Sequence, residues 1–182
     1  AGCLGHGDEE AQLSERAIEA LRGVRVRDCA AGDEFSLAVA GDGALWSWGC
    51  GDEGRLGHAD EEACHTPRRV AALAATPVRG ASAGGDHSVV LSEAGEVWTF
   101  GCGEEGQLGH GDRANQLEPR RVAALAGQRV AEAHAGFFYT AALMQDGSLR
   151  TWGHGEGGKL GHGDEEAREV PTVCGALEGC LV

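Results

Sequence analysis

The tripeptide Leu-Gly-His occurs four times in this 182-residue chain, and each copy follows the previous one by 52 residues. The copies begin at Leu4, Leu56, Leu108 and Leu160. The same interval separates further positions, namely Gly32, Gly84 and Gly136; Gly43, Gly95 and Gly147; Trp48, Phe100 and Trp152; Pro67, Pro119 and Pro171. A fixed interval of this length is typical of chains that repeat and stack one small structural unit. The period therefore predicts about three and a half copies of one unit.

Each unit contains the pattern of a β-hairpin. In the first complete unit, residues 36–40 are mostly apolar, Gly41-Asp42-Gly43 is a turn signal, and residues 44–48 are rich in aromatic and apolar side chains. Residues 24–31 offer a strand before the hairpin, and residues 68–70 offer a fourth after Pro67.

Short strands, 31 glycines and a period near 50 favour small sheets arranged radially, each burying its faces against its neighbours. Ala- and Leu-rich stretches such as residues 70–75 are too short to be independent helices, so we expect them to connect successive sheets.

The units themselves resemble a known family. The stretch Gly43-Ala-Leu-Trp-Ser-Trp-Gly-Cys-Gly-Asp-Glu-Gly-Arg-Leu-Gly-His58 and its counterpart from Gly95 to His110 are similar to repeats of the regulator-of-chromosome-condensation family, and the resemblance covers essentially the whole chain. The usual fold of that family is a seven-bladed β-propeller, so the resemblance implies half a ring.

We expect an all-β partial β-propeller of about three and a half four-stranded antiparallel blades in a single domain over residues 1–182. Its repeat units fall at about 1–26 (partial), 27–78, 79–130 and 131–182. The chain begins with Ala1 in the middle of the pattern, which predicts that it is a piece of something longer.

The composition limits the classes of partner. The chain has 29 acidic and 15 basic residues and a formal charge of -14. Such a surface repels phosphate, so we expect no direct nucleic-acid binding through this segment, and basic proteins are the better partners. There is no apolar run of membrane-spanning length and no secretory leader pattern, so the expected location is cytoplasm or nucleus, away from membranes.

The cysteines give no sign of a disulfide framework. Seven are present, an odd number, and no two form a C-x-x-C pair. They are Cys3, Cys29, Cys50, Cys64, Cys102, Cys174 and Cys180. We expect reduced, mostly inert thiols.

Three motifs resemble a cofactor site, a metal site and a catalytic site. Residues 49–54 match the dinucleotide fingerprint G-x-G-x-x-G, but that motif must open a helix, whereas Leu56-Gly57-His58 follows here at once. The histidines of the Leu-Gly-His tripeptides recur at one repeat position, which spreads them around a ring instead of gathering them on one metal ion. Asp86-His87-Ser88 lie next to one another on a strand and point to alternate faces, so they cannot form a hydrolase triad. We expect no catalytic residue, no cofactor and no metal.

Function in a repeat protein is carried by positions that vary while the framework stays fixed. One such place holds Asp33-Glu34-Phe35, Gly85-Asp86-His87 and Phe137-Phe138-Tyr139 in the three units. These residues precede an inner hairpin strand, on a loop face that family members use for partners. The candidate partner-binding residues are Glu34, Asp86, His87, Phe137, Phe138 and Tyr139. Packing of at least one of the aromatic side chains into the core is an equally good interpretation.

A second acidic series follows the shared histidine, at residues 8–10, 60–62 and 164–166, with Asp112 and Arg113 in the remaining unit. Most such runs are solvated surface. A functional interpretation is long-range attraction of a basic partner.

The resemblance implies three functions. The founding member of the family catalyses nucleotide exchange on the small GTPase Ran while docked on chromatin, and Asp86-His87 resembles residues on its GTPase-facing loops. Another version is a substrate-recognition or scaffold module of a larger protein such as a HECT-type ubiquitin ligase. A third is the plant ultraviolet-B receptor, whose Gly-Trp-Arg-His-Thr motifs are replaced here, for example by Gly84-Gly-Asp-His-Ser88. The absence of that tryptophan and arginine argues against the receptor function. The chain is best interpreted as a protein-binding segment and not an enzyme, with GTPase regulation as the leading specific function.

Overall fold

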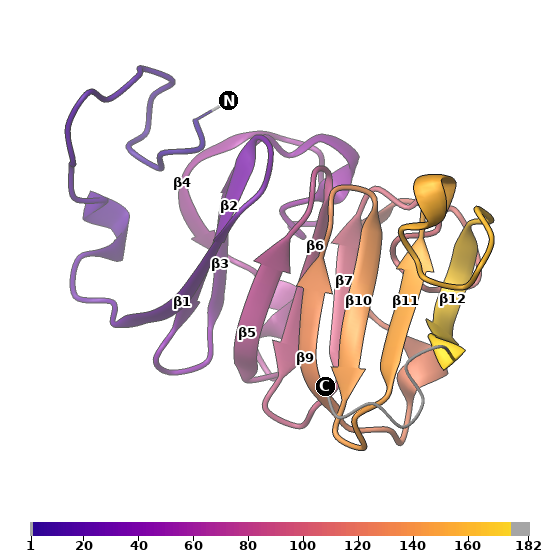
Figure 1. The fold of residues 1–182 in the computed structure, drawn as a ribbon. Helices are drawn as coiled ribbons and strands as arrows, with labels where there is room; N and C mark the ends of the chain where they lie inside the picture. Colours follow the sequence, from indigo (N-terminus) through magenta and orange to yellow (C-terminus); the bar gives the residue numbers. More distant parts are fainter. Residues whose placement is uncertain (1, 176–182) are drawn as a thin grey trace.

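Residues 2–175 are described by the computed structural model, and they contain three four-stranded antiparallel sheets. Blade 1 consists of β1 (Val26–Ala31), β2 (Phe35–Ala40), β3 (Leu45–Gly49) and β4 (Cys64–Arg69). Blade 2 consists of β5 (Val78–Ala83), β6 (His87–Ser92), β7 (Val97–Gly101) and β8 (Gln116–Arg121). Blade 3 consists of β9 (Val130–Ala135), β10 (Tyr139–Met144), β11 (Leu149–Gly153) and β12 (Arg168–Val173). The prediction of an all-β fold built from four-stranded antiparallel blades is confirmed (Figure 1).

Short 3-10 helices connect the strands. They are η1 (Glu19–Leu21), η2 (Asp52–Gly54), η3 (Ala71–Leu73), η4 (Ala123–Leu125) and η5 (Glu156–Gly158). As expected, η3 lies in the Ala- and Leu-rich connection between blades 1 and 2. Residues 2–25, in the partial unit, contain η1 and no strand among the described residues.

Within each blade the strands pair in the order of the chain, because tight hairpins join neighbours. In blade 1 the β2–β3 hairpin pairs Ser36 with Trp48 and Val39 with Leu45. Gly43 closes its turn with a φ of 83°, a conformation that glycine adopts without the steric cost of a Cβ.

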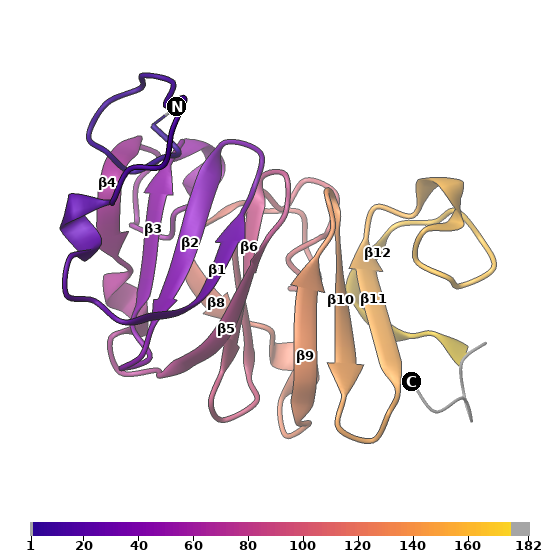
Figure 2. The same ribbon diagram turned by 60° about the vertical axis from the view of Figure 1, so that its left-hand side comes forward.

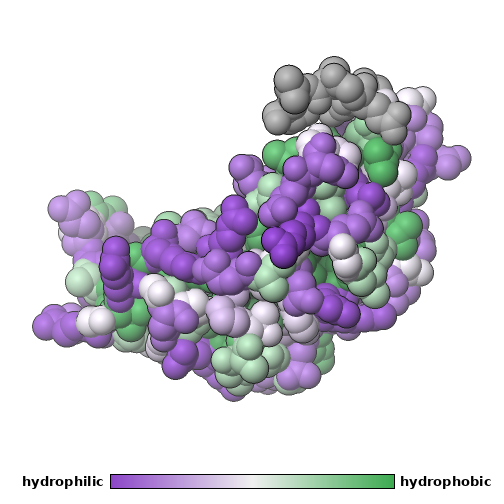
Figure 3. Space-filling view, turned by 90° about the horizontal axis from the view of Figure 1, so that it is seen from below, coloured by the Kyte–Doolittle hydropathy of each residue, from purple (hydrophilic) through white to green (hydrophobic). Residues whose placement is uncertain are grey.

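The blades stand side by side, as Figure 2 shows. The first strands of the blades, β1, β5 and β9, contact one another in order, whereas β4, β8 and β12 are the outer strands. Seen from below, the molecule has a curved outline and a mainly hydrophilic surface (Figure 3).

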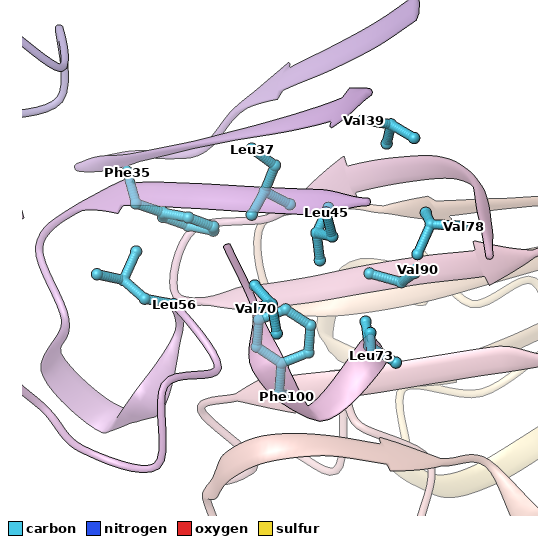
Figure 4. Close-up of a cluster of buried hydrophobic side chains, with 10 residues drawn as sticks. All are labelled: Phe35, Leu37, Val39, Leu45, Leu56, Val70, Leu73, Val78, Val90 and Phe100. Atoms are coloured by element: carbon cyan, nitrogen blue, oxygen red, sulfur yellow. The ribbon is translucent and has the colours of Figure 1, made fainter. Parts of the chain in front are cut away.

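The core lies between the blades. One cluster joins blades 1 and 2 and contains Phe35, Leu37, Val39, Leu45, Leu56, Val70, Leu73, Val78, Val90 and Phe100 (Figure 4). A second cluster joins blades 2 and 3 around Val130, Met144 and Trp152. The equivalent residues Trp48, Phe100 and Trp152 are 5%, 0% and 0% exposed, so this repeat position is a matching buried site in all three blades.

A repeated hydrogen-bond pattern fixes each Leu-Gly-His loop to its own blade. The hydroxyls of Ser47, Thr99 and Thr151 donate to the carbonyls of Leu56, Leu108 and Leu160, at 2.7, 2.7 and 2.6 Å. The same hydroxyl oxygens lie 3.0, 3.0 and 3.1 Å from Nε2 of His58, His110 and His162. The shared histidines therefore hold loops in place, one in each blade.

Replacing Thr99 with valine is expected to lower the free energy of unfolding by about 1–2 kcal/mol, because the buried Leu108 carbonyl loses its hydrogen-bond donor. Valine keeps the shape of threonine, so the loss measures the hydroxyl. Urea denaturation followed by tryptophan fluorescence gives the difference. The control is Thr66→Val, at an exposed position of β4, and an equal loss in both variants would contradict the role given to Thr99.

Candidate functional site

Six short segments form one end of the three blades, which we call the upper rim. They are the turns 32–34, 84–86 and 136–138 and the loops 50–54, 102–106 and 154–158. Within each blade a backbone hydrogen bond joins turn to loop, from Cys50 N to Glu34 O (2.9 Å), from Cys102 N to Asp86 O (2.9 Å) and from His154 N to Phe138 O (3.0 Å). In each blade the rim turn and the rim loop are therefore fixed to each other, and both lie at the upper end of the sheets in Figure 1.

The structure separates the predicted site residues into two layers. Glu34 and Phe137 are exposed on the rim, and Asp86 and Phe138 are half-buried beside them. His87 is completely buried, so the prediction that it offers a surface contact does not hold. Tyr139 is half-buried at the same repeat position as His87 and the buried Phe35.

These three rings fill the space beneath the rim turns. A Cβ on Gly84 would lie 2.5 Å from the His87 ring, and a Cβ on Gly136 would lie 2.2 Å from the Tyr139 ring. Only glycine lets the turn close over a ring in this way. The alternative expectation from the sequence is that at least one of the aromatic side chains packs into the core. That expectation describes the layer of rings beneath the turns.

Burial sets the protonation state of His87. Its Nε2 lies 3.0 Å from the Thr140 hydroxyl, and its Nδ1 has no hydrogen-bond partner in the described part of the chain. Desolvation lowers the pKa of His87 from 6.5 to about 4, so the ring is neutral at pH 7. Partial burial, with Arg120 nearby, also lowers the pKa of His110 to about 4.

The contact between blades 1 and 2 at the rim, which we call the first seam, is closed by an ion pair. Arg55 Nη1 lies 2.8 Å from Asp86 Oδ1, and Arg55 Nε donates to the carbonyl of Asp52 at 2.9 Å. The Arg55 side chain is 7% exposed, so the charge of Asp86 is largely neutralised within the protein.

The contact between blades 2 and 3, the second seam, uses different residues at the same repeat positions. Gln107 replaces Arg55 and Phe138 replaces Asp86. The Phe137 and Phe138 rings lie 4.5 Å apart in an edge-to-face arrangement, and the His154 ring lies 6.3 Å from Phe138. Phe137 is 56% exposed. This seam presents an aromatic pair where the first presents a neutralised charge.

Arg55 and Gln107 were not among the residues predicted from the sequence. Their position varies as strongly as the turn residues do, with Cys3, Arg55, Gln107 and Lys159 in successive units. Variation at a fixed repeat position was therefore the signal that could have found them.

The rim is acidic. Its six segments contain eight carboxylates and no lysine or arginine; they are Asp33, Glu34, Asp52, Glu53, Asp86, Glu104, Glu105 and Glu156. Arg55 and Lys159 flank the segments. The acidic loops after the shared histidines use their first aspartate structurally, since Asp60 Oδ1 accepts a hydrogen bond from Glu62 N at 3.2 Å.

The dinucleotide-like glycines serve the backbone. Gly49 has a φ of 111° at the end of β3, and a Cβ on Gly51 would lie 2.1 Å from the Glu62 carbonyl oxygen. The motif leads into η2, a three-residue 3-10 helix, so no helix N-terminus is available for a pyrophosphate.

The described residues form no assembled site for a metal ion or for redox chemistry. No group of three or more His, Cys, Asp or Glu residues within 2–175 could hold a metal ion. Six cysteines in this part of the chain are free thiols, and Cys180 lies outside the described residues. Burial raises the pKa of Cys102 to about 11, which keeps this thiol protonated at neutral pH. None of the described helices has the length and apolar character of a membrane-spanning helix.

Comparison with known proteins supports the repeat at the level of sequence. The family model described as "Regulator of chromosome condensation (RCC1) repeat" matches residues 42–91, 94–143 and 146–180. The chain is 37% identical to the human E3 ubiquitin-protein ligase HERC2 over 180 residues, which are 98% of this chain and 4% of HERC2. It is 34% identical to the ultraviolet-B receptor UVR8 of Arabidopsis thaliana over 181 residues, which cover the whole chain and 41% of the receptor.

The fold agrees with this assignment. A crystal structure of Prp20p from Saccharomyces cerevisiae, described with its binding properties to Gsp1p and histones, superposes with a TM-score of 0.74 at 27% identity. The match covers 82% of this chain and 38% of that one. The chain thus spans well under half of each of these proteins. Matching repeat models, a 52-residue period and three similar blades lead to one conclusion, that this chain is a β-propeller segment belonging to the regulator of chromosome condensation (RCC1) repeat family.

Proposed function

We propose that this chain binds other proteins through its upper rim, and that its leading specific role is regulation of a small GTPase as a guanine-nucleotide exchange factor. The observation that carries the proposal is the exposed Phe137 ring, packed edge-to-face on the half-buried Phe138, on a rim with unneutralised carboxylates. Aromatic anchors surrounded by polar groups are typical of protein-binding hot spots. The similarity to Prp20p, described with its binding to Gsp1p and histones, supports a GTPase or a basic protein as the partner.

In this role the segment does no covalent chemistry. An exchange factor stabilises the nucleotide-free form of its GTPase, so its contribution is binding energy directed at one conformation. A rim that presents aromatic and acidic side chains on a fixed backbone can supply such energy with little ordering cost. The proposed location is the nucleus or the cytoplasm.

A second candidate is substrate recognition within a larger ubiquitin ligase. It is favoured by the 37% identity to HERC2 over 98% of the chain. Both functions would use the rim to bind a protein. They differ in the result of binding, which is nucleotide release from a GTPase in the first and ubiquitin transfer to the bound protein in the second.

The experiment that separates them uses the full-length protein. Release of a fluorescent guanine nucleotide from a panel of purified small GTPases tests exchange, and ubiquitin transfer to captured partners tests the ligase version. Acceleration of nucleotide release supports the first function, and modified partners without such acceleration support the second. Retention of no protein in affinity capture would contradict both.

The double variant Phe137→Ala/Phe138→Ala is expected to reduce capture of the partner by about tenfold or more, because the apolar anchor on the rim is lost. Quantitative affinity capture measures this, and thermal denaturation checks that the melting temperature stays nearly unchanged. Leu13→Ala is the control, since Leu13 is fully exposed outside the rim. Unfolding of the double variant would mean that both phenylalanines are core residues.

A further inference from the structure

The two seams differ in how completely their polar groups are satisfied. In the first seam Arg55 has Asp86 as its partner. In the second seam the Gln107 side chain is fully buried, and its Nε2 has no hydrogen-bond partner among the described residues. Its Oε1 accepts a hydrogen bond from Glu105 N at 2.8 Å, which holds the amide against the rim loop 102–106. A buried donor without an acceptor is costly, so this position is prepared for an oxygen that the described chain does not provide.

The backbone of Gln107 lies close to that of Phe138. A Cβ on Gly153 would be 2.6 Å from the Phe138 carbonyl oxygen and 3.2 Å from the Gln107 Cα, so the two backbones approach each other at the second seam. By repeat position, Gln107 and Phe138 are the counterparts of Arg55 and Asp86, which form the ion pair of the first seam.

Phe137 is held in place by Gly85 of blade 2. Gly85 N donates to the Phe137 carbonyl at 3.1 Å, and a Cβ on Gly85 would lie 3.2 Å from the Phe137 ring. The absence of a side chain at Gly85 lets the ring lie close to blade 2. An apolar group that packs on Phe137 therefore meets a surface that is already ordered.

The charges of the rim turns and loops are mainly acidic, and Lys159, whose Nζ lies 3.0 Å from His154 Nδ1, is an exposed cation beside the second seam. Asp33, Glu34 and Glu104 are exposed and make no ion pair with a described residue. Carboxylates away from the rim are commonly neutralised, as in Arg120–Asp112 at 3.3 Å and Arg121–Glu96 at 2.7 Å. The unneutralised charge on the rim favours cationic groups and opposes phosphate.

We infer that the second seam binds an extended, basic polypeptide segment that carries one large apolar side chain. The apolar side chain packs on Phe137 and Phe138, a main-chain carbonyl accepts the hydrogen bond from Gln107 Nε2 after a rotation of the Phe138 ring, and lysine or arginine side chains meet the carboxylates of blades 1 and 2. This inference rests on the proposed protein-binding function and names the chemistry of the partner.

A direct test measures fluorescence anisotropy of labelled 12-residue peptides with the full-length protein. The probe contains lysine, arginine and serine with one central leucine. One comparison peptide replaces the leucine with serine, and another replaces every basic residue with glutamate. We expect the leucine peptide to bind about tenfold more tightly than its serine counterpart, the acidic peptide not to bind, and affinity to fall as salt is raised.

The decisive variant is Gln107→Arg/Phe138→Asp, which copies the ion pair of the first seam into the second. It leaves the net charge of -14 unchanged and removes both the Phe138 ring and the unpaired amide. We expect it to weaken the leucine peptide about tenfold and the serine peptide by clearly less, because the serine peptide loses only the main-chain hydrogen bond to Gln107 and no apolar contact. If its melting temperature falls, Phe137→Ser gives the same test at an exposed position.

Matched charge variants separate a local site from bulk attraction. Asp33→Asn/Glu34→Gln/Glu104→Gln removes three charges from the rim, and Glu15→Gln/Glu118→Gln/Glu132→Gln removes three exposed charges elsewhere. We expect the rim variant to weaken both basic peptides and the other variant to bind like the wild type. Equal losses in both, or unchanged binding of the leucine peptide by both seam variants, would overturn the inference. If Phe137→Ala/Phe138→Ala still abolishes capture of a partner protein while no basic peptide binds, the proposed function stands and only this inference fails.

Discussion

Replacing Phe100 with alanine is expected to lower the free energy of unfolding by about 3–5 kcal/mol, because a large ring is lost from the packing between two blades. The Phe100 ring is 0% exposed and belongs to the cluster between blades 1 and 2. Its removal leaves a cavity that the two blades cannot readily close, since each is held by its own hydrogen-bonded strands. A Cβ on Gly57 would lie 2.8 Å from this ring, so the Leu-Gly-His loop of blade 1 also packs on it and loses support.

The matched control is the same change at Phe137, which is 56% exposed. Phe137→Ala is expected to alter the free energy of unfolding by no more than about 0.5 kcal/mol. Urea denaturation of both variants, followed by circular dichroism, measures the difference. Similar losses at the two positions would show that Phe137 is part of the core, and would remove it from the proposed site.

Acid is expected to destabilise this protein between pH 6.5 and pH 4, in part through His87. The folded pKa of His87 is about 4 because its ring is desolvated, whereas the unfolded chain binds the proton near pH 6.5. Stability from the neutral ring is therefore fully present above pH 6.5 and is lost as the pH falls towards 4, since the unfolded state then binds more protons. The loss from this one residue is about 2 kcal/mol at pH 5 and about 3 kcal/mol below pH 4.

His87→Phe tests this assignment, because Phe35 already occupies the equivalent site in blade 1. The variant is expected to lose about 2 kcal/mol less than the wild type between pH 7 and pH 5 in urea denaturation. His134→Phe, at an exposed position of β9, is the control and should keep the acid sensitivity of the wild type. A His87→Phe variant as sensitive to acid as the wild type would show that His87 is already accessible to protons in the folded state.

The repeat made most of the fold predictable from the sequence. The glycines, hairpin patterns and shared aromatic positions each recur three times, so a strand or turn inferred in one unit is supported by the other two. Burial of Trp48, Phe100 and Trp152 followed from the same reasoning, because residues at one repeat position share one environment. Residues 2–25 differ from the complete units and contain no strand among the described residues, since a strand needs a hydrogen-bonded neighbour.

The candidate site was only partly predictable. The sequence located the variable turns, but three consecutive residues such as Phe137, Phe138 and Tyr139 give no indication of which ring points outward. That depends on the turn geometry, which places position 139 and its equivalent His87 beneath the glycine of the turn. The sequence also does not indicate which residue contacts each turn. Arg55, which pairs with Asp86, lies 31 residues earlier in the chain, in a loop of the preceding blade.

The architecture therefore follows from the repeat, because a 52-residue period of apolar and glycine positions imposes the same hydrogen bonds and the same burial on every unit. The chemistry of the rim could be read only from the folded molecule, because it arises where different blades meet. The ion pair of Arg55 with Asp86 neutralises the first seam, whereas the second seam has the Phe137–Phe138 pair and a Gln107 amide nitrogen without a partner among the described residues. Contacts between residues of different repeats depend on how the blades pack, which no property of a single repeat specifies.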